Sequence, residues 1–151
     1  MKTTLRNQKG FTLIEILLVV AAIAILAGIV IVAINPGKQL GDTRNAQRKS
    51  DVNTILNAIS QYTVDNNGAL PAGLTNTPTE ICQSSVATTS CGSLLDLSVL
   101  TAGGKYIVSV PNEPQATTTN GAGYRAWKTA SGRISVEAAF PEQGASISAT
   151  R

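Results

Sequence analysis

The sequence predicts an α+β fold in which one long N-terminal helix, first apolar and then amphipathic, packs on a small antiparallel β-sheet of about three to four strands. Three observations predict it. A run of nineteen residues without a charge covers residues 16–34, apolar side chains recur at helical spacing over residues 52–62, and strand-like segments begin only near residue 105. We expect four parts along the chain, which are residues 1–10, 11–35, 36–66 and 67–151.

Residues 1–10 carry the whole net charge of the chain. Lys2, Arg6 and Lys9 account for the formal charge of +3, and the remaining residues include nine basic and nine acidic ones. The sequence pI near 9.1 therefore reports the N-terminal segment. It does not indicate a nucleic acid or an anionic membrane as a partner.

The uncharged run Ile16–Ile34 predicts a helix of membrane length. At 1.5 Å per residue it would span about 28 Å, close to the thickness of a bilayer core. The run is apolar on every side, so it suits lipid or a buried helix bundle. Glu15 stands at its start, and a carboxylate in a bilayer costs about 2.5–3.5 kcal/mol on insertion scales. We therefore expect Glu15 to have a partner or a role.

Three ordinary explanations of this run each leave something unexplained. Cleavage of a secretory signal peptide at Ala22-Ile23-Ala24 would leave residues 25–34 as an exposed apolar start. A plain single-pass anchor explains the length but not Gly10-Phe11 or Glu15. A carboxylate at a helix N-terminus is favoured by about 0.3–1 kcal/mol, which excludes no further role. Basic residues flank the run on both sides, so the loop-charge rule does not decide its orientation.

Residues 6–15, which read Arg-Asn-Gln-Lys-Gly-Phe-Thr-Leu-Ile-Glu, closely resemble the class III leader junction of type IV pilins and type II secretion pseudopilins. The resemblance covers the leader and the whole apolar run. It implies that a prepilin peptidase cuts after Gly10 on the cytoplasmic side of the membrane and methylates the new N-terminal Phe11. It also implies that Glu15 pairs with the terminal amine of a neighbouring subunit in a helical homopolymer.

The same resemblance implies further partners and a location. The partners are other copies of the chain, the prepilin peptidase, a membrane platform with its assembly ATPase, and membrane lipid. The chain is expected to cross the cytoplasmic membrane once with its head outside, and then to enter an extracellular pilus or a periplasmic pseudopilus. The cysteines favour this orientation, because a disulfide forms in an oxidising compartment.

Elementary electrostatics agrees with pairing at this junction. Cleavage after Gly10 would create an ammonium at Phe11, and a lone ammonium and a lone carboxylate are both costly away from water. The two charges can meet within one helix or between subunits. Only pairing between subunits sets an axial register. This contact repeats head to tail without closing, which generates a filament.

The long N-terminal helix expected over residues 11–66, which we call the stem, is predicted to be interrupted where the apolar run ends. Many members of the resembled family place a helix-disturbing proline nearer the start of the stem. A proline inside a helix removes a hydrogen bond, so we expect a kink at Pro36 and Gly37 and a bent or melted stem over residues 35–41. The alternative is that the first helix ends here and a second begins at Asp42 or Thr43, which are acceptable N-caps.

The second part of the stem predicts an amphipathic helix. Its apolar residues fall at i, i+3, i+4, i+7 and i+10, and they are Val52, Ile55, Leu56, Ile59 and Tyr62. Asn66-Asn67-Gly68 and then Pro71 stop the helix near residue 66. The apolar stripe needs a sheet to cover it.

Three segments predict the covering sheet, and they are residues 105–110, 124–128 and 133–140. The last two flank a turn at residues 130–132 and form a hairpin. One face of the hairpin is expected to pack on the helix stripe through Ile134, Val136, Ala138 and Phe140. In the first segment Tyr106, Val108 and Val110 are candidates for the same core. Residues 94–100 predict a short helix or turn.

Cys82 and Cys91 are the two cysteines of the chain. Their spacing fits neither a CxxC redox motif nor a zinc site, and it predicts a disulfide in an oxidising compartment. Such a bond would stabilise a small head by roughly 2–3 kcal/mol. The alternative is two free thiols in a cytosolic protein. The Thr/Ser-rich stretches at residues 75–90 and 117–120 predict surface loops.

The chain contains no histidine, which excludes Ser-His-Asp and Cys-His catalysis and every His-ligated metal site. The acidic residues beyond the apolar run form no recognisable pair. We therefore expect no catalytic residue, no cofactor and no metal. Residues 110–114 resemble the Pro-x-acid-Pro loop of the major type II secretion pseudopilin, near which loops of that family can bind calcium. With Glu113 as its one acidic residue, this segment predicts no metal.

Two groups of basic residues invite other interpretations. Aromatic and basic residues mix on the hairpin as they do in single-strand binders, at Tyr124, Arg125, Trp127, Lys128 and Arg133. Strand alternation splits them between two faces, so a nucleic acid is the weaker alternative for a partner. The second group predicts a solvated or inter-subunit face of the stem, and it comprises Arg44, Arg48 and Lys49 beside Asp42 and Asp51.

The sequence therefore predicts a structural subunit of a type IV pilus-like extracellular filament and not an enzyme. The alternative is a pseudopilin of a type II secretion or competence system, which shares all the chemistry above. A membrane-anchored enzyme and a minor adhesin at the filament tip are weaker alternatives. Long fibres that vanish on deletion would separate the first function from the second.

Overall fold

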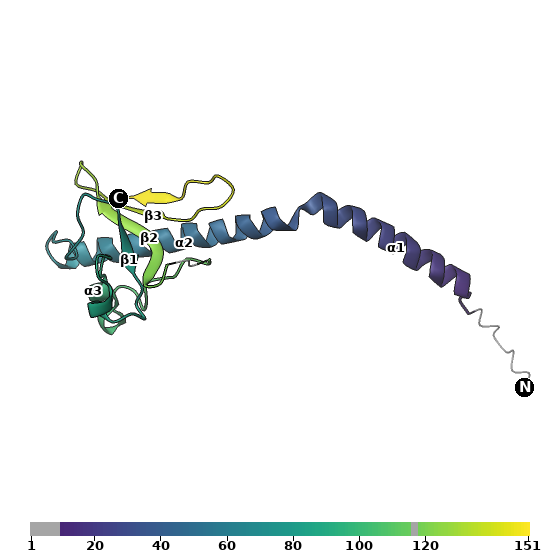
Figure 1. Ribbon diagram of the computed structural model, residues 1–151, viewed down its shortest axis with the longest axis horizontal. Coiled ribbons are helices and arrows are strands. Elements are labelled where there is room, and N and C mark those ends of the chain that lie inside the picture. Colours follow the sequence, from purple (N-terminus) through teal and green to yellow (C-terminus); the bar gives the residue numbers. More distant parts are fainter. Residues whose placement is uncertain (1–9, 116–117) are drawn as a thin grey trace, which may run out of the picture. The chain divides into compact units, whose positions relative to one another are not determined.

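The computed structural model describes residues 10–115 and 118–151. The chain divides into two compact units, of which the first ends at Gln39 and the second is Leu40–Arg151. The first unit contains helix α1, and the second contains most of helix α2 and all of a four-stranded sheet (Figure 1). The predicted α+β class is confirmed.

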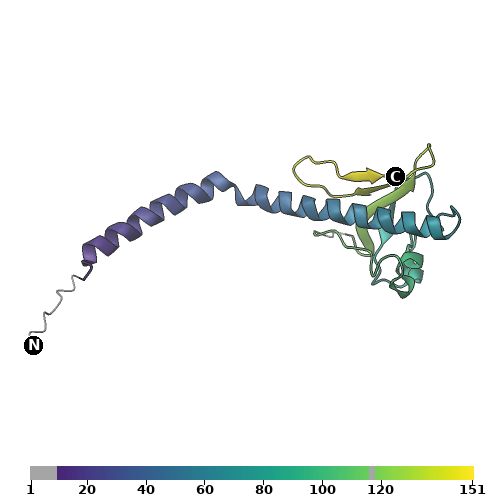
Figure 2. The same cartoon turned by 180° about the vertical axis from the view of Figure 1, so that it is seen from behind.

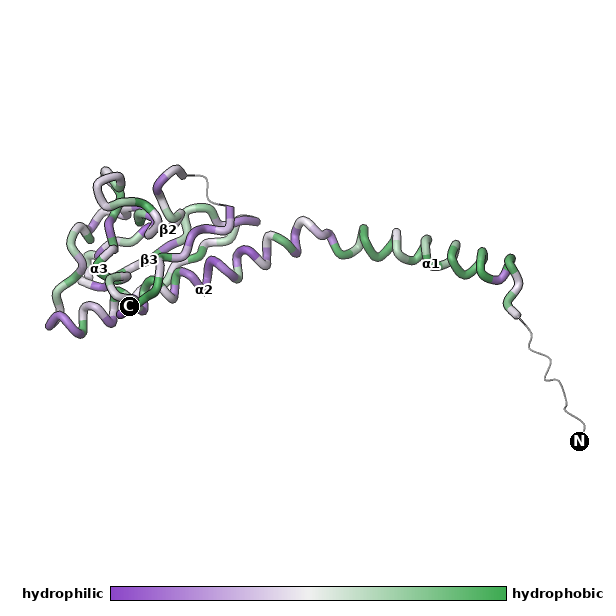
Figure 3. The backbone as a smooth tube through the Cα atoms, turned by 90° about the horizontal axis from the view of Figure 1, so that it is seen from below, coloured by the Kyte–Doolittle hydropathy of each residue, from purple (hydrophilic) through white to green (hydrophobic). Residues whose placement is uncertain are grey.

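Helix α1 spans Leu13–Ile34 and has no buried residue. Thr12 is its N-cap, and the Thr12 hydroxyl oxygen accepts a hydrogen bond of 3.3 Å from the backbone N–H of Glu15. Figure 3 shows that α1 is mostly hydrophobic beyond its first turn, which contains Glu15. Among the described residues, α1 is the one helix long and apolar enough to cross a membrane.

The break between the helices is confined to Asn35. This residue has a φ of 47°, in the left-handed region, and ends α1. Helix α2, Pro36–Asp65, begins at the next residue. Proline suits the first helical position because it has no N–H to leave unpaired there. The Asn35 side-chain oxygen accepts a 3.2 Å hydrogen bond from the backbone N–H of Lys38, so Asn35 also caps α2.

Two expectations about this segment need correction. Pro36 and Gly37 are the first residues of α2, so residues 36–41 are helical in this structure and are not melted. The alternative, that the first helix ends here and a second begins, is confirmed, but the second helix begins at Pro36 and not at Asp42 or Thr43. Asn35 supplies the cap several residues earlier, and it already satisfies the first N–H groups of α2.

The apolar stripe on α2 is confirmed. Val52, Ile55, Leu56 and Ile59 are buried, and Tyr62 packs against the same core with part of its surface exposed. They meet the inner face of the sheet, where Ala122, Tyr124, Ala126, Ile134, Val136 and Ala138 are buried. Figures 1 and 2 show the strands lying along α2 in both views.

The sheet has four antiparallel strands in the order β1-β2-β3-β4. Their bounds are β1 Thr79–Cys82, β2 Gly121–Lys128, β3 Ile134–Ala138 and β4 Ser148–Thr150. The central hairpin of β2 and β3 confirms the predicted one, with pairs from Tyr124–Ala138 to Lys128–Ile134. The edge strands β1 and β4 were not predicted, because they are short and mostly polar.

Residues 105–110 are not a strand, so this expectation is wrong. The segment is an irregular loop after the short helices α3, Ser98–Thr101, and η2, Ala102–Gly104. Val108 is 84% exposed, whereas Val110 is buried and Tyr106 is half-buried. The backbone N–H of Ile107 bonds to the carbonyl of Leu100 instead of to a strand. Phe140 lies beyond the end of β3 and is exposed, which corrects its expected place in the core.

The predicted disulfide between Cys82 and Cys91 is present, with the two Cα atoms 5.6 Å apart. It joins the end of β1 to the residue after the short helix η1, Thr88–Ser90. Both cysteines are buried. The bond therefore closes the loop of residues 83–90 against the core.

Candidate functional site

The residues predicted for processing and assembly lie at the open end of the first unit. Gly10, Phe11 and Glu15 are all exposed. Because Thr12 caps α1, Glu15 falls in the first turn of the helix, where its carboxylate faces the positive end of the helix dipole. Residues 1–9 of the leader lie outside the described residues, so cleavage after Gly10 and methylation of Phe11 stay predictions.

The side chains around Glu15 are apolar, and among the described residues none forms an ion pair with its carboxylate. Large side chains such as Leu13, Ile16 and Val20 are about half to four-fifths exposed. A shallow depression bordered by Phe11, Leu13, Ile16 and Val20 runs along this face of α1. A carboxylate in such surroundings gains most from an opposite charge brought by another molecule. The geometry of one chain thus leaves both the helix and its acid available for assembly.

A second feature is a buried ionic cluster in the second unit, which sequence reasoning missed. We call it the polar clamp, and its members are Arg44, Asn45, Arg48, Glu113 and Glu142. It joins α2 to two loops that are far away in sequence, at residues 111–115 and 141–146. No buried side-chain nitrogen or oxygen atom in the described residues lacks a hydrogen-bond partner. The clamp is therefore fully satisfied, as buried polar groups must be.

Arg48 is the centre of the polar clamp and is 0% exposed. Its Nε donates to Glu113 Oε1 at 2.6 Å, and its Nη1 donates to Glu142 Oε2 at 2.8 Å and to Asn45 Oδ1 at 3.0 Å. Its Nη2 reaches the side-chain oxygen of Gln115 at 3.2 Å. Burial alone would lower the pKa of Arg48. The hydrogen bonds that Arg48 donates to Glu142 and Glu113, with the negative charges of these two carboxylates, outweigh burial and raise that pKa.

Arg44 forms the outer part of the clamp. Its Nε and Nη2 donate to the two carboxylate oxygens of Glu142 at 2.6 and 2.5 Å, which is a bidentate pair. The side-chain amide of Asn45 donates to the backbone carbonyl of Glu142 at 2.9 Å, and its oxygen accepts from the backbone N–H of Glu142 at 3.0 Å. The hydrogen bonds from Arg44 and then Arg48 hold the pKa of Glu142 down to about 2. Glu142 is thus ionised over the whole neutral range.

A second buried polar pair lies one helical turn further along α2. The hydroxyl of Tyr124 on β2 donates to Asp51 Oδ2 at 2.6 Å, and the amide of Gln47 donates to Asp51 Oδ1 at 2.8 Å. Burial first, and then the hydrogen bond with Asp51, raises the pKa of the Tyr124 hydroxyl far above its ordinary value. Tyr124 therefore remains a neutral donor to Asp51.

These contacts correct the predicted role of the stem cations. Arg48 is buried and Arg44 is partly buried against Glu142, so they do not form a solvated face; of that group, Lys49 is exposed. A signal was present in the sequence. Residues 45, 48, 52, 55 and 59 fall on one helical face, so the apolar stripe continues towards the N-terminus of α2 through Asn45 and Arg48. Partners of Arg48 lie more than sixty residues away, and nothing in the sequence identifies them.

The hairpin group does not form one basic surface. Tyr124 is buried under α2, and Trp127 is half-buried. Arg125 forms an ion pair of 3.5 Å with Glu137 on the neighbouring strand. A single-strand binding surface needs exposed aromatic rings beside free cations. This hairpin places its buried tyrosine away from its exposed basic residues.

Glu113, the acidic residue of the segment that resembles a pseudopilin loop, is committed to Arg48 and to the backbone N–H of Gln115. Gly123 on β2 has a φ of 78° and lies so close to Glu113 that a Cβ atom would collide with it. Within the described residues, no group of three or more His, Cys, Asp or Glu side chains is placed to hold a metal ion.

The family match with known proteins lies in the N-terminal part of the chain. The family described as the prokaryotic N-terminal methylation motif matches residues 5–31. The type II secretion system core protein G of Aeromonas hydrophila is 37% identical over 62 residues, which make up 41% of this chain and 42% of that protein. The core protein G of Escherichia coli strain K12 is 37% identical over 60 residues, 40% of each chain.

A third relative has the same name and extent. The type II secretion system core protein G of Pectobacterium carotovorum subsp. carotovorum is 35% identical over 61 residues, 40% of this chain and 38% of that protein. The match with this chain thus spans about two fifths of the length of each of these curated relatives. No solved structure matches the chain significantly.

Proposed function

Because the N-terminal part of this chain is that of the type IV pilin and type II secretion pseudopilin family, we propose that the protein is a structural subunit of a helical filament. The subunit is made in the membrane, cut between Gly10 and Phe11 by a prepilin peptidase, and N-methylated on Phe11. Its partners are further copies of itself, membrane lipid, and a membrane platform with its assembly ATPase.

The observation that carries this proposal is the state of α1. None of its side chains is buried in the single chain, although its sequence is apolar on every side. A bilayer or a bundle of identical helices satisfies such a surface. Glu15 lies in its first turn, one helical turn from the terminus that cleavage would create. An ion pair from Glu15 to the Phe11 ammonium of the next subunit sets the axial register of the bundle.

Two kinds of filament are compatible with this chemistry. The first is a long extracellular pilus, with adhesion or motility as its use. The second is a short periplasmic pseudopilus of a secretion or competence system, which is supported by the name shared by the three relatives above. Imaging of cells for long fibres that disappear on deletion of the gene separates the two.

The substitution Glu15→Ala tests the assembly role. We expect membrane insertion and leader cleavage to remain intact and filament yield to fall below detection, because the Phe11 ammonium loses its partner in an apolar bundle. Sheared filament measured by immunoblot and electron microscopy reports the result. Normal filament yield from Glu15→Ala would refute the proposal.

Two controls accompany this experiment. Lys128→Ala removes one exposed charged side chain at the end of β2, outside α1, and it is expected to leave the yield unchanged. The mass spectrum of wild-type filament should show a chain that begins at Phe11, carries one methyl group and has both cysteines oxidised. A chain that keeps residues 1–10 in the filament contradicts the proposed processing.

A further inference from the structure

The sequence Asn-Gly-Ala occurs twice in the described part of the chain, and the structure holds the two copies very differently. The first begins at Asn67, in the turn that follows α2, and the second begins at Asn120, where β2 starts. An asparagine followed by glycine is the pair most prone to deamidation, because glycine has no side chain to shield its backbone nitrogen. The local sequence is the same at both sites, so any difference in their reactivity reports the fold.

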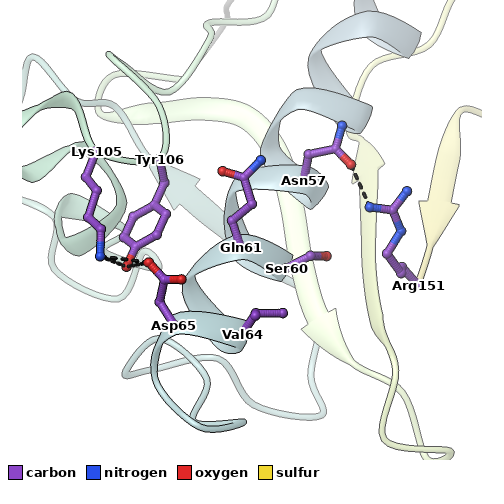
Figure 4. Close-up of a pocket in the computed structure, with 8 residues that line it drawn as sticks. All are labelled: Asn57, Ser60, Gln61, Val64, Asp65, Lys105, Tyr106 and Arg151. Atoms are coloured by element: carbon purple, nitrogen blue, oxygen red, sulfur yellow. Dashed lines mark hydrogen bonds and ion pairs between the residues drawn. The ribbon is translucent and has the colours of Figure 1, made fainter.

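The first copy lies in an exposed turn at the end of an anchored helix. The carboxylate of Asp65, the last residue of α2, lies 2.7 Å from Lys105 Nζ and accepts a 3.1 Å hydrogen bond from the Tyr106 hydroxyl (Figure 4). Beyond this anchor both Asn67 and Gly68 are exposed, with φ values of 54° and 91°. Left-handed residues of this kind are common just past the end of a helix.

The reacting atoms of this turn are accessible. The side-chain amide of Asn67 has no hydrogen-bond partner among the described residues. A Cβ atom at Gly68 would meet no other atom within 4 Å, so the backbone nitrogen is sterically open. Its N–H donates to the carbonyl of Thr63 at 2.8 Å. This hydrogen bond has to open before the nitrogen can react, and hydrogen bonds at exposed helix ends open at a small cost in free energy.

The second copy is held by hydrogen bonds to two other segments. The side-chain amide of Asn120 donates to the carbonyl of Ser90 at 2.9 Å, and its backbone carbonyl accepts from the N–H of Gln83 at 2.9 Å. Gly121 is buried and pairs with Cys82 between β1 and β2, and its carbonyl accepts from the side chain of Gln83 at 2.8 Å. Rotation of Asn120 towards the nitrogen of Gly121 would break these bonds.

We propose that Asn67 is a deamidation site, at which water converts the asparagine into aspartate and isoaspartate. The nitrogen of Gly68 loses its proton and attacks the side-chain carbonyl carbon of Asn67. The bond from that carbon to the amide nitrogen breaks, ammonia leaves, and a five-membered succinimide remains. Water then opens the ring at the side-chain carbonyl, which gives aspartate, or at the backbone carbonyl, which gives isoaspartate. Each event replaces a neutral amide with one carboxylate.

Neighbouring asparagines of α2 and its turn lack these features. Asn66 donates through its amide to the carbonyl of Tyr62 at 2.8 Å, and the residue after it has a side chain. Asn53 donates to the carbonyl of Lys49 at 2.7 Å and precedes the β-branched Thr54. All these residues belong to the second unit. The proposal therefore stands apart from the filament function proposed above.

The full chain is incubated in detergent micelles at mildly alkaline pH, and tandem mass spectrometry of its proteolytic peptides locates each deamidated asparagine over time. We expect deamidation at Asn67 to be at least tenfold faster than at Asn120. Methyl transfer from labelled S-adenosylmethionine by an isoaspartate methyltransferase should report the isoaspartate product. Asn67→Gly keeps a residue that accepts the left-handed backbone and should remove most of the methyl acceptance. Circular dichroism checks that this variant is folded.

The same incubation in urea tests the structural cause. Unfolding releases Asn120 from Ser90 and Gln83, so the two copies should then deamidate at similar rates. The proposal is overturned if Asn120 reacts as fast as Asn67 in the folded chain. It is also overturned if Asn67 stays intact in the folded chain while both copies react in urea, or if the tenfold difference persists in urea.

Discussion

The helices α1 and α2 follow one another along the chain and differ in how they are stabilised. Every residue of α1 is exposed in the single chain. In α2, nine residues are buried against the sheet and loops of the same chain. The apolar surface of α1 can thus be buried only in lipid or by other molecules, whereas α2 buries its apolar face within its own chain. From this comparison we expect the proposed membrane insertion and assembly to depend on α1, and the stability of residues 40–151 to depend on α2.

The buried face of α2 is itself divided. From Ile55 to Ile59 it is apolar and meets the sheet. From Asn45 to Asp51 it is polar and meets two loops and the hydroxyl of Tyr124 on β2. The apolar part gains stability from area removed from water. The polar part gives little net free energy but tolerates no missing partner. The following substitutions are expected to sharpen this distinction, from the largest effect to the smallest.

The largest effect on folding is expected from Arg48→Ala. It leaves Glu113 buried without its cation, which typically costs about 3–5 kcal/mol of the free energy of unfolding. Urea unfolding of the full chain in detergent, followed by the fluorescence of Trp127, measures this loss. Arg44→Ala removes the partly exposed partner of Glu142 and is the matched control, with a loss of about 1 kcal/mol or less. Equal losses in the two variants would show that Arg48 is not the centre of the clamp.

A loss of about 2–5 kcal/mol is expected from Ile59→Ala, because the substitution leaves a cavity between α2 and the sheet. The same change in α1, Ile25→Ala, should leave head unfolding unchanged, since Ile25 touches no core. The same urea titration compares the two. A head destabilised by Ile25→Ala would contradict the independence of the two helices.

Removal of the disulfide by the double change Cys82→Ser and Cys91→Ser is expected to cost roughly 2–3 kcal/mol, because the loop it closes is short. Adding reductant should lower the free energy of unfolding of the oxidised wild type by the same amount. Reductant should leave the double variant unchanged, because that variant has no disulfide to reduce. The expectation is contradicted if the unfolding midpoint of the wild type does not change although a thiol assay shows that both cysteines are reduced.

The smallest effect concerns acid. The folded pKa of Glu142 is about 2, below its ordinary value of 4.5, so the stability that its ionised form contributes is fully present above about pH 4.5 and is lost as pH falls towards 2. Thermal unfolding between pH 6 and pH 2 measures this slope. Glu142→Gln should flatten it, and an unchanged slope in that variant would assign acid sensitivity to other carboxylates.

Local patterns in the sequence were sufficient for the elements that depend on them. The apolar run, the stripe from Val52 to Ile59 and the β2–β3 hairpin all follow from periodicity and turn residues within a short window. The fold class and the apolar half of the core could therefore be predicted.

What could not be predicted depends on contacts between distant residues. Strands β1 and β4 are polar and short, and they exist because β2 and β3 offer free edges to them. Residues 105–110 alternate like a strand, but Tyr106 is held by Asp65 and Tyr62, and the segment pairs with none of the four strands. Arg48 lies on a helical stripe, yet its partners Glu113 and Glu142 become neighbours only through the fold.

The choice of arginine for the buried position has a consequence for the environments in which the head stays intact. A lysine buried at the same position could lose its proton at alkaline pH and release both loops, whereas the guanidinium of an arginine stays protonated at such pH. Alkali therefore leaves residue 48 charged, whereas Glu142 loses its charge only in strong acid, near its pKa of about 2. A protein outside the cytoplasm, where pH is not buffered, would benefit from an ion pair that withstands alkaline pH and is lost only in strong acid.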